Sequence, residues 1–340
     1  MACVNAAHAN VAFFIPHRGC PHRCSFCDQR AISGEGQALT PEDVAEQLKA
    51  AFSRDLNPDT TEIAFFGGSF TCLPPREMEG FLQAAFPYVQ SGKCRGIRVS
   101  TRPDGISKPI LDLLSRYGVT AIELGAQSLD DKVLQINGRG HTAEDVRTAS
   151  EEIRRYPGNP FSLGLQIMTG LPGEDEKSRE LTQKAALSIH PDTLRLYPTV
   201  VIRGTELARW MEAGIYCPPN LEETVSFAAP MLEQYEKAGI RVIRAGLHAS
   251  RELETEMLGG AYHPAFRELC QSELFRQKLE KSLAGQPKGK GILTVHPRFV
   301  SIAIGQKRKN LLWAEGQGYP LKIRTDETLE PGNFTLDFEN

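Results

Sequence analysis

The chain has 340 residues, of which 41% are hydrophobic and 24% are charged, and its formal net charge is −3. These values are ordinary for a globular protein, and the net charge excludes a global attraction to nucleic acid or to membranes while leaving local patches open. No apolar stretch approaches the length of a transmembrane helix, and residues 1–10 lack the basic start and apolar core of a signal peptide. We therefore expect a cytoplasmic protein without membrane association, built as one large domain with an appendage or as two domains.

Short apolar runs alternate with longer amphipathic stretches. The runs have the length of buried strands and cover residues 11–15, 62–66, 96–100, 121–124, 162–168, 193–197 and 241–244. The stretches between them have helical spacing, one beginning at Thr40-Pro41 and others covering 75–89, 108–117, 142–155, 174–189 and 221–238. Six or so such units in about 240 residues predict an α/β fold with a parallel sheet, either a full or partial β/α barrel or a doubly wound open sheet.

Three cysteines follow the first predicted strand: Cys20, Cys24 and Cys27, at x3 and x2 spacing. Such a thiolate group predicts a metal site. Iron–sulfur clusters are usually held by four thiolates, so three would leave one iron of a four-iron cluster open to a substrate or cofactor. The alternative is a zinc site completed by His17 or His22. The other cysteines are scattered and are predicted to be packing residues: Cys3, Cys72, Cys94, Cys217 and Cys270.

The C-x3-C-x2-C motif, with Phe26 before its last cysteine, resembles that of the radical S-adenosylmethionine (SAM) enzymes. The resemblance implies a 4Fe–4S cluster whose open iron chelates SAM, and an electron donor such as flavodoxin or ferredoxin. One electron from the reduced cluster would cleave SAM to methionine and a 5′-deoxyadenosyl radical, which abstracts hydrogen from a substrate. It also favours a partial (β/α)6 TIM-like barrel over the doubly wound sheet.

The segments after the predicted strands extend the resemblance. They contain Thr-Arg-Pro-Asp at 101–104, Glu-Leu-Gly-Ala-Gln-Ser at 123–128, Gly-Arg-Gly-His-Thr at 138–142, Gly-Leu-Pro-Gly at 170–173 and Leu-Tyr-Pro-Thr at 196–199. Together these segments resemble the radical domain of the Elongator catalytic subunit and, more distantly, the oxygen-independent coproporphyrinogen oxidases. The likeness runs from about residue 11 to about residue 244. Fewer than 100 residues follow, without an acetyltransferase pattern, so we expect a stand-alone relative with its own substrate.

The resemblance also assigns contacts with SAM. Gly68 and Ser69 would contact the methionine amino group, since glycines let a backbone approach a ligand closely; the alternative is a simple turn. Gln127 and Arg139 would face the ribose and the carboxylate of SAM, a surface ion pair being the alternative for Arg139.

Three further contacts with SAM follow from the resemblance. Ser100 and Gln166 stand where the coproporphyrinogen oxidases carry acidic residues against the cofactor, and an amide still bonds a ribose hydroxyl; the alternative for Gln166 is a strand residue that hydrogen bonds a neighbouring loop. Phe26 would lie against the adenine, the alternative being packing within its loop. Arg102 and His141 stand close to the same segments in sequence, with open roles.

The last part of the chain, residues 246–340, is predicted to form a small α+β appendage to a barrel covering residues 1–245. It contains a helical stretch at 252–284, a glycine-rich linker at 285–291 and strand-like runs at 291–296, 299–304 and 321–325. Residues 281–314 include seven basic residues and no acidic one, with Phe299 and Trp313 among them. This basic stretch predicts an RNA-binding surface, or else a solvated face.

Three functions remain open from the sequence. The first is a radical SAM enzyme that acts on RNA, above all tRNA. The second uses the same chemistry on a small molecule or a protein side chain, as an oxidoreductase or maturase. The third is a non-enzymatic zinc-binding module.

Overall fold

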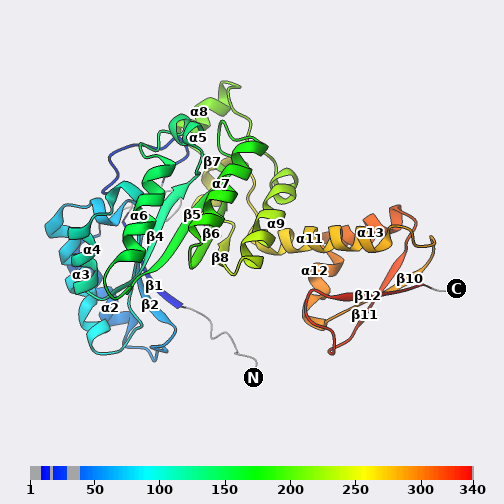
Figure 1. The fold of residues 1–340 in the computed structure, drawn as a ribbon, viewed down its shortest axis with the longest axis horizontal. Helices are drawn as coiled ribbons and strands as arrows, with labels where there is room; N and C mark the ends of the chain where they lie inside the picture. Colours follow the sequence, from blue (N-terminus) through cyan, green and yellow to red (C-terminus); the bar gives the residue numbers. More distant parts are fainter. Residues whose placement is uncertain (1–8, 16–17, 29–38, 339–340) are drawn as a thin grey trace.

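The computed structural model describes residues 9–15, 18–28 and 39–338, and its main element is a seven-stranded parallel sheet (Figure 1). The strands lie in sequence order: β1 (Ala9–Phe14), β2 (Thr61–Phe66), β3 (Ile97–Thr101), β4 (Val119–Gln127), β5 (Ser162–Thr169), β6 (Thr193–Pro198) and β8 (Arg241–Ala245). A doubly wound sheet reverses its strand order at a switch point, and this sheet does not. With β1 and β8 at its two ends, it is a curled, open half-barrel, which confirms the predicted partial barrel.

The predicted helices connect these strands. They are α2 (Pro41–Ala51), α3 (Pro75–Gln90), α4 (Lys108–Arg116), α5 (Asp131–Ile136), α6 (Ala143–Arg155), α7 (Glu176–Ile189), α8 (Glu206–Glu212) and α9 (Leu221–Lys237). Helix α2 begins where the sequence predicts, because the Thr40 hydroxyl accepts the Asp43 N–H at 3.2 Å and the Asp43 carboxylate accepts the Thr40 N–H at 2.9 Å. Capping boxes of the same kind begin α6 and α9.

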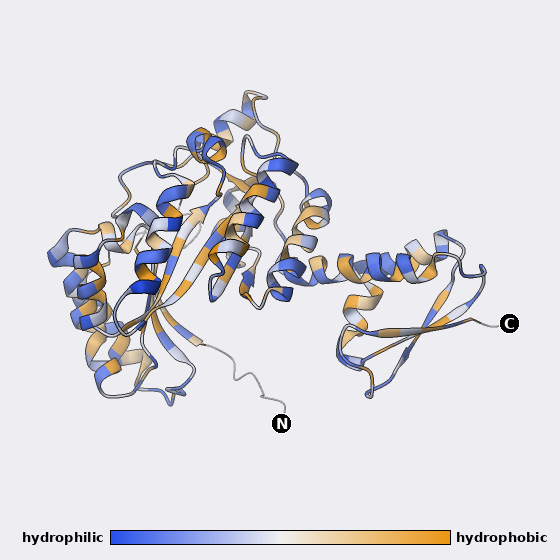
Figure 2. Ribbon diagram, viewed as in Figure 1, coloured by the Kyte–Doolittle hydropathy of each residue, from blue (hydrophilic) through white to orange (hydrophobic). Residues whose placement is uncertain are grey.

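The two faces of the sheet differ in polarity. Side chains alternate between the faces of a strand, and one set, which includes Phe65, Val99 and Leu124, packs with the helices into the main core. The opposite set carries Glu123 and Arg195, which are buried although charged. Figure 2 shows the apolar positions running along the strands and recurring on the flanking helices. The concave face is therefore polar, unlike the apolar interior that fills a closed barrel.

A small insertion follows β6. Strand β7 (Val200–Ile202) pairs antiparallel with β9 (Met257–Gly260), which comes after α10 (Arg251–Glu256). The single helical stretch predicted at 252–284 is thus wrong. It is divided because Gly260 has a φ of +99° and because the chain at 257–260 pairs as a strand.

Helix α11 (Phe266–Leu283) runs from the half-barrel into the appendage (Figure 1). Its first turns, with Phe266 and Cys270, belong to the main core, and Leu279 and Leu283 belong to a second core. The appendage contains β10 (Gly291–Val295), α12 (Val300–Ile304), α13 (Lys309–Gly316), β11 (Leu321–Thr325) and β12 (Phe334–Phe338), with strand order β11-β10-β12. Its α+β character is as predicted, but the strand predicted at 299–304 is wrong, since this segment forms α12. The boundary at 245/246 stays a prediction.

Four short 3-10 helices complete the described secondary structure: η1 (Phe70–Cys72), η2 (Pro103–Gly105), η3 (Pro297–Phe299) and η4 (Gln306–Arg308). None of the described helices combines the length and the apolarity that crossing a membrane requires.

Candidate functional site

The loop that carries the three cysteines follows β1 and lies directly on the turn that follows β2, which contains Gly67 and Gly68 and is called the Gly-Gly turn. The Ser69 N–H donates to the Arg18 carbonyl at 2.9 Å. Gly19 and Gly68 both have positive φ, and a Cβ on either would come within 2.2 Å of a carbonyl oxygen of the other loop. Only glycine permits such a backbone contact. The Gly-Gly turn therefore holds the cysteine loop in place.

The other side of the cysteine loop is fixed through Ser25. Its N–H donates to the Asn137 carbonyl at 3.1 Å, and its hydroxyl donates to Asn137 Oδ1 at 2.7 Å. The Asn137 amide in turn donates to the Val133 and Pro172 carbonyls, and the Ser25 carbonyl accepts the Leu207 N–H at 2.8 Å. The backbone between Cys24 and Cys27 is thus connected to α5, to the loop after β5 and to α8.

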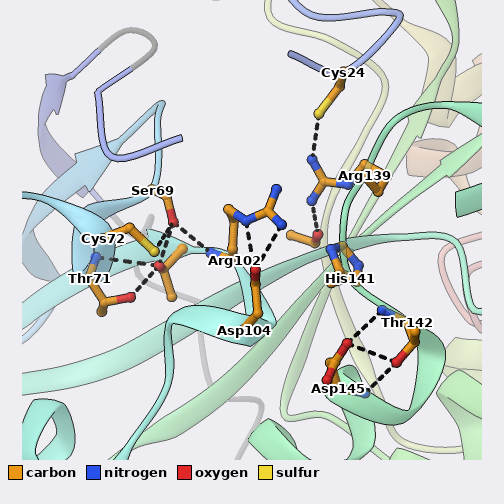
Figure 3. A network of polar contacts seen from close by, with 12 residues as sticks. Cys24, Ser69, Thr71, Cys72, Arg102, Asp104, Arg139, His141, Thr142 and Asp145 are labelled. Atoms are coloured by element: carbon orange, nitrogen blue, oxygen red, sulfur yellow. Dashed lines mark hydrogen bonds and ion pairs between the residues drawn. The ribbon is translucent and has the colours of Figure 1, made fainter. Parts of the chain in front are cut away.

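Arg139 lies between the cysteine loop and the end of β4 (Figure 3). Its Nη1 donates to Cys24 Sγ at 3.0 Å and its Nη2 donates to the Gly125 carbonyl at 2.5 Å. A guanidinium beside a thiol favours the thiolate, which is the form that binds metal. The structure thus places Arg139 against a predicted cluster ligand, and its contact with SAM stays a prediction.

The cysteine thiols are close enough to influence one another. Burial, followed by the neighbouring Cys24, raises the pKa of Cys20 to about 11, and the same causes raise the pKa of Cys27 to about 12. Three thiolates in one loop therefore need bound cations to be stable, as a cluster of iron ions would supply. Within the described ranges, no three His, Cys, Asp or Glu side chains converge on a single metal ion. His17, one of the residues proposed to complete a zinc site, lies outside those ranges.

The scattered cysteines have different surroundings. Cys94 and Cys270 are buried, as predicted for packing residues. Cys217 is exposed, so the prediction that it is a packing residue is wrong. Cys72 lies beside the Gly-Gly turn, near enough to Cys20 to raise its pKa. Cys3 lies outside the described residues.

Several buried polar atoms without partners belong to residues near the cysteine loop. Among the described residues, no partner is found for Gln127 Oε1, Arg139 Nε, Arg102 Nη1 and His141 Nδ1. Gln127 also has a φ of +65°, a strained conformation for a residue other than glycine. Buried polar groups are normally paired, so two donors and two acceptors left open indicate a polar ligand. SAM carries both a carboxylate and hydroxyls, and this set of groups fits it.

His141 is neutral in this environment. Burial and the positive charges of Arg139 and Arg102 lower its pKa to about 4. Its Nε2 lies 3.3 Å from the Ala126 carbonyl, which makes Nε2 the donor and leaves Nδ1 as an acceptor. The role that the sequence left open for His141 is therefore that of an uncharged acceptor near Arg139, in the arrangement drawn in Figure 3.

The Ser69 side chain is already engaged within the protein. Its hydroxyl lies 3.0 Å from Thr101 Oγ1, accepts the Arg102 N–H at 3.1 Å and lies 3.3 Å from Cys72 Sγ (Figure 3). These contacts join the turns that follow β2 and β3. The contacts of Gly68 and Ser69 with SAM stay predictions.

Ser100 and Gln166 meet on the concave face. The Gln166 amide donates to Ser100 Oγ at 3.1 Å and to Glu123 Oε2 at 2.9 Å. Glu123 also accepts two bonds from Arg195, at 2.7 and 3.0 Å, and one from Arg98 at 3.0 Å. Arg98 pairs in addition with Glu62. This network was not predicted from the sequence, although charged residues at alternate positions within apolar strands are its signal.

Phe26 packs into a small apolar cluster rather than standing alone. It lies against buried residues of β7 and α8, among them Val201, Leu207 and Ala208. The structure thus supports the packing alternative for part of its surface, and the contact with adenine stays a prediction.

The chain matches known protein families and individual proteins. A family model described as the Radical SAM superfamily matches residues 14–186, and one described as Radical_SAM C-terminal domain matches residues 191–276. The tRNA uridine(34) acetyltransferase of Dehalococcoides mccartyi is 29% identical over 242 residues, which cover 59% of this chain and 51% of that protein. Elongator complex protein 3 of Mus musculus is 32% identical over 193 residues, covering 49% and 34%. The chain thus spans from about a third to about half of the length of these relatives.

A solved structure shows the same fold. The archaeal Methanocaldococcus infernus Elp3 with an N-terminal deletion matches with a TM-score of 0.63 at 18% identity, covering 84% of this chain and 66% of that chain.

Proposed function

We propose that this chain, which belongs to the radical SAM superfamily, abstracts a hydrogen atom from an RNA substrate, with tRNA as the first candidate. It is an enzyme of that superfamily, and its cofactors are a 4Fe–4S cluster and SAM. The observation that carries the site assignment is the group of unpartnered buried atoms on Gln127, Arg139, Arg102 and His141, near the cysteine loop. Reduced flavodoxin or ferredoxin would deliver the electron, and the cytoplasm, where tRNA is found, would be the location.

The residues would divide the work as follows. Cys20, Cys24 and Cys27 would hold the cluster, which when bound and reduced would supply the electron for the cleavage of SAM. Arg139 stabilises the Cys24 thiolate through Nη1 and offers Nε to the carboxylate of SAM. Gln127 offers its open Oε1 as a hydrogen-bond acceptor.

The contacts with the rest of SAM are assigned in the same way. Gly68 and Ser69 form the turn for the methionine amino group, Ser100 and Gln166 face the ribose, and Phe26 faces the adenine. Gln166 is held for this task by its bonds to Ser100 and Glu123, which fix the orientation of its amide.

Two observations support RNA as the substrate. One relative is named for tRNA uridine(34), and all seven basic residues of the basic stretch are exposed: Lys281, Lys288, Lys290, Arg298, Lys307, Arg308 and Lys309. Lys309 pairs with Glu222, in the first turn of α9, at 2.5 Å. That helix returns from the carboxyl edge of the sheet to β8, so Lys307 to Lys309 lie toward the edge that carries the cysteine loop.

The aromatic residues of this stretch do not add to the proposal. Trp313 lies under the Arg276 guanidinium, 5.2 Å from it, and Phe299 packs on Phe275. Both belong to the appendage core, so the argument for RNA depends on charge.

The decisive experiment is mass spectrometry of nucleosides from total tRNA and rRNA in cells with and without the gene. A modified nucleoside that disappears in the deletion strain identifies the substrate. Unchanged RNA would instead favour a small molecule or a protein side chain. In parallel, the Cys24→Ala protein should form no 5′-deoxyadenosine from SAM under reducing, anaerobic conditions. Normal formation would refute the assignment of the cysteines.

RNA binding has its own test. Neutralising Lys307, Arg308 and Lys309 should weaken tRNA binding and lower the slope of log K against log salt by about two, since Lys309 is already paired. The matched control neutralises three exposed lysines on barrel helices, Lys108, Lys184 and Lys237, each paired within its own helix. An equal loss of tRNA affinity in both triple variants would contradict a specific role for the appendage in binding RNA.

A further inference from the structure

Two arginines lie side by side on the last two strands of the half-barrel. Arg195 of β6 and Arg244 of β8 are direct partners in the register of the parallel pair. Like charges placed opposite each other on neighbouring strands destabilise a sheet. Such a conflict between local rules and the fold is most often found at functional sites.

The two guanidiniums differ in how their charge is balanced. Arg195 makes a two-bond ion pair with Glu123 at 2.7 and 3.0 Å. Arg244 donates only to backbone, from Nε to the Gly246 carbonyl at 3.1 Å and from Nη2 to the Leu247 carbonyl at 2.8 Å. No ion pair to Arg244 is found within residues 9–15, 18–28 and 39–338, and none of the charges that act on it belongs to a carboxylate.

The other charges on the concave face do not balance Arg244. Glu62, Arg98, Glu123 and Arg195 form a continuous network with two negative and two positive charges. Arg244 adds one positive charge that this network does not balance. A half-buried guanidinium in this state is stabilised when an anion binds it.

Two polar side chains, those of Tyr197 and His248, lie near Arg244. Tyr197, on β6, lies close enough to Arg195 and to Arg244 to interact electrostatically with both. His248 follows β8, and burial together with the positive charges of Arg244 and Arg195 lowers its pKa. Tyr197 shares the concave face with Gln166, whose neighbouring strand is β6. The position is therefore one strand away from the expected ribose contact.

We propose that Arg244, together with Tyr197 and His248, binds an oxyanion of the substrate and so holds the reacting group beside SAM. The oxyanion would be a phosphodiester of RNA, or the phosphate or carboxylate of a small molecule. The assignment of this anion to the substrate depends on the proposed function, whereas anion binding itself is measured without turnover. Failure of the RNA proposal and failure of this site are therefore distinguishable.

The first test uses the native, full-length, cluster-loaded protein. Phenylglyoxal modification of arginine is followed by peptide mass spectrometry, with SAM in excess, in inorganic phosphate or in chloride of equal ionic strength. We expect phosphate to slow the modification of Arg244 at least fivefold. Arg241 is the internal control, since it lies exposed on the same strand and its rate should not change. Equal rates for Arg244 in the two salts would overturn the proposal.

Variants give an independent test in case Arg244 reacts too slowly to follow. Phosphate should raise the melting temperature of the wild type and of Arg241→Gln, and this shift should be lost in Arg244→Gln and partly retained in Arg244→Lys. An undiminished shift in Arg244→Gln would overturn the site. The source of the anion follows from protection of Arg244. Protection by tRNA indicates a phosphodiester, whereas protection by phosphate or acetate but not by tRNA indicates a small-molecule anion.

Discussion

Replacing Glu123 with glutamine tests whether the buried network supports the site. The carboxylate is 1% exposed and accepts four hydrogen bonds, two from Arg195, one from Arg98 and one from Gln166, at 2.7 to 3.0 Å. Burial alone would raise the pKa of Glu123, but the guanidiniums of Arg195 and Arg98 outweigh it and lower the pKa. The group is therefore an ionised acceptor at neutral pH.

The magnitude follows from these contacts. A glutamine keeps one acceptor oxygen and turns an NH2 group toward the guanidiniums, so about two of the bonds are lost, each worth roughly 1.5–3 kcal/mol. In other proteins, removing one partner of a buried ion pair lowers the free energy of unfolding by about 3–5 kcal/mol. Both routes give a loss of about 4 kcal/mol in the free energy of unfolding.

The assay is urea unfolding of the full-length protein, followed by circular dichroism. The control is Glu151→Gln, which breaks an exposed pair with Arg155 at 2.9 Å and should cost less than about 0.5 kcal/mol. SAM affinity should also fall in Glu123→Gln, because Gln166 loses one of its two acceptors. The reasoning is refuted if Glu123→Gln unfolds within about 1 kcal/mol of the control, an amount typical of an ordinary substitution.

Three more predictions concern single residues. Gly68→Ala should lower the free energy of unfolding by more than about 2 kcal/mol and lower the amount of bound iron, because its Cβ would lie 2.2 Å from the Arg18 carbonyl oxygen. Gly92→Ala, with φ +68° and open space around the added Cβ, should lower the free energy of unfolding by only about 1 kcal/mol, and equal losses in the two variants would contradict the loop contact. Burial raises the pKa of Glu174 from 4.5 to about 7. The contribution of Glu174 to the free energy of unfolding is therefore fully present below about pH 4.5, and the protein loses about 3 kcal/mol of stability as the pH rises through about 7. If the unfolding of Glu174→Gln keeps this pH dependence, another group is responsible. Arg139→Gln should weaken SAM binding at least about tenfold in equilibrium dialysis, as expected for a lost charge-assisted bond, and unchanged affinity would remove Arg139 from the SAM site.

Most of the half-barrel was predictable because its signals are local. Each strand of the main sheet has a continuous or alternating apolar run, and helix starts such as Thr40 carry their own capping groups. The segment at 299–304 shows where local signals fail. Its β-branched residues favour a strand, yet Val300, Ala303 and Ile304 have helical spacing and pack on the appendage core, so tertiary contacts decided the outcome.

The site was predictable only in part, for the same reason. The cysteines and the Gly-Gly turn are short motifs within one loop each. The ion network joins Glu62, Arg98, Glu123 and Arg195, which are separated by 25 to 72 residues where they bond. Which of them meet depends on which strands are neighbours, and the sequence alone does not state that. The docking of Gly19 on the turn after β2 depends in the same way on the pairing of β1 with β2.

The open edge of the half-barrel explains why its concave face is charged rather than apolar. A closed barrel excludes water and is filled by branched apolar side chains, whereas an open one must receive a cofactor and a substrate. Paired charges keep such a face rigid and polar without an excess of either sign. Glu62, Arg98, Glu123 and Arg195 meet that requirement, and Arg244, on the edge strand β8, departs from it by one positive charge. This unbalanced charge lies on an edge strand of the sheet, which is why the proposed anion site and the choice of substrate are tested together.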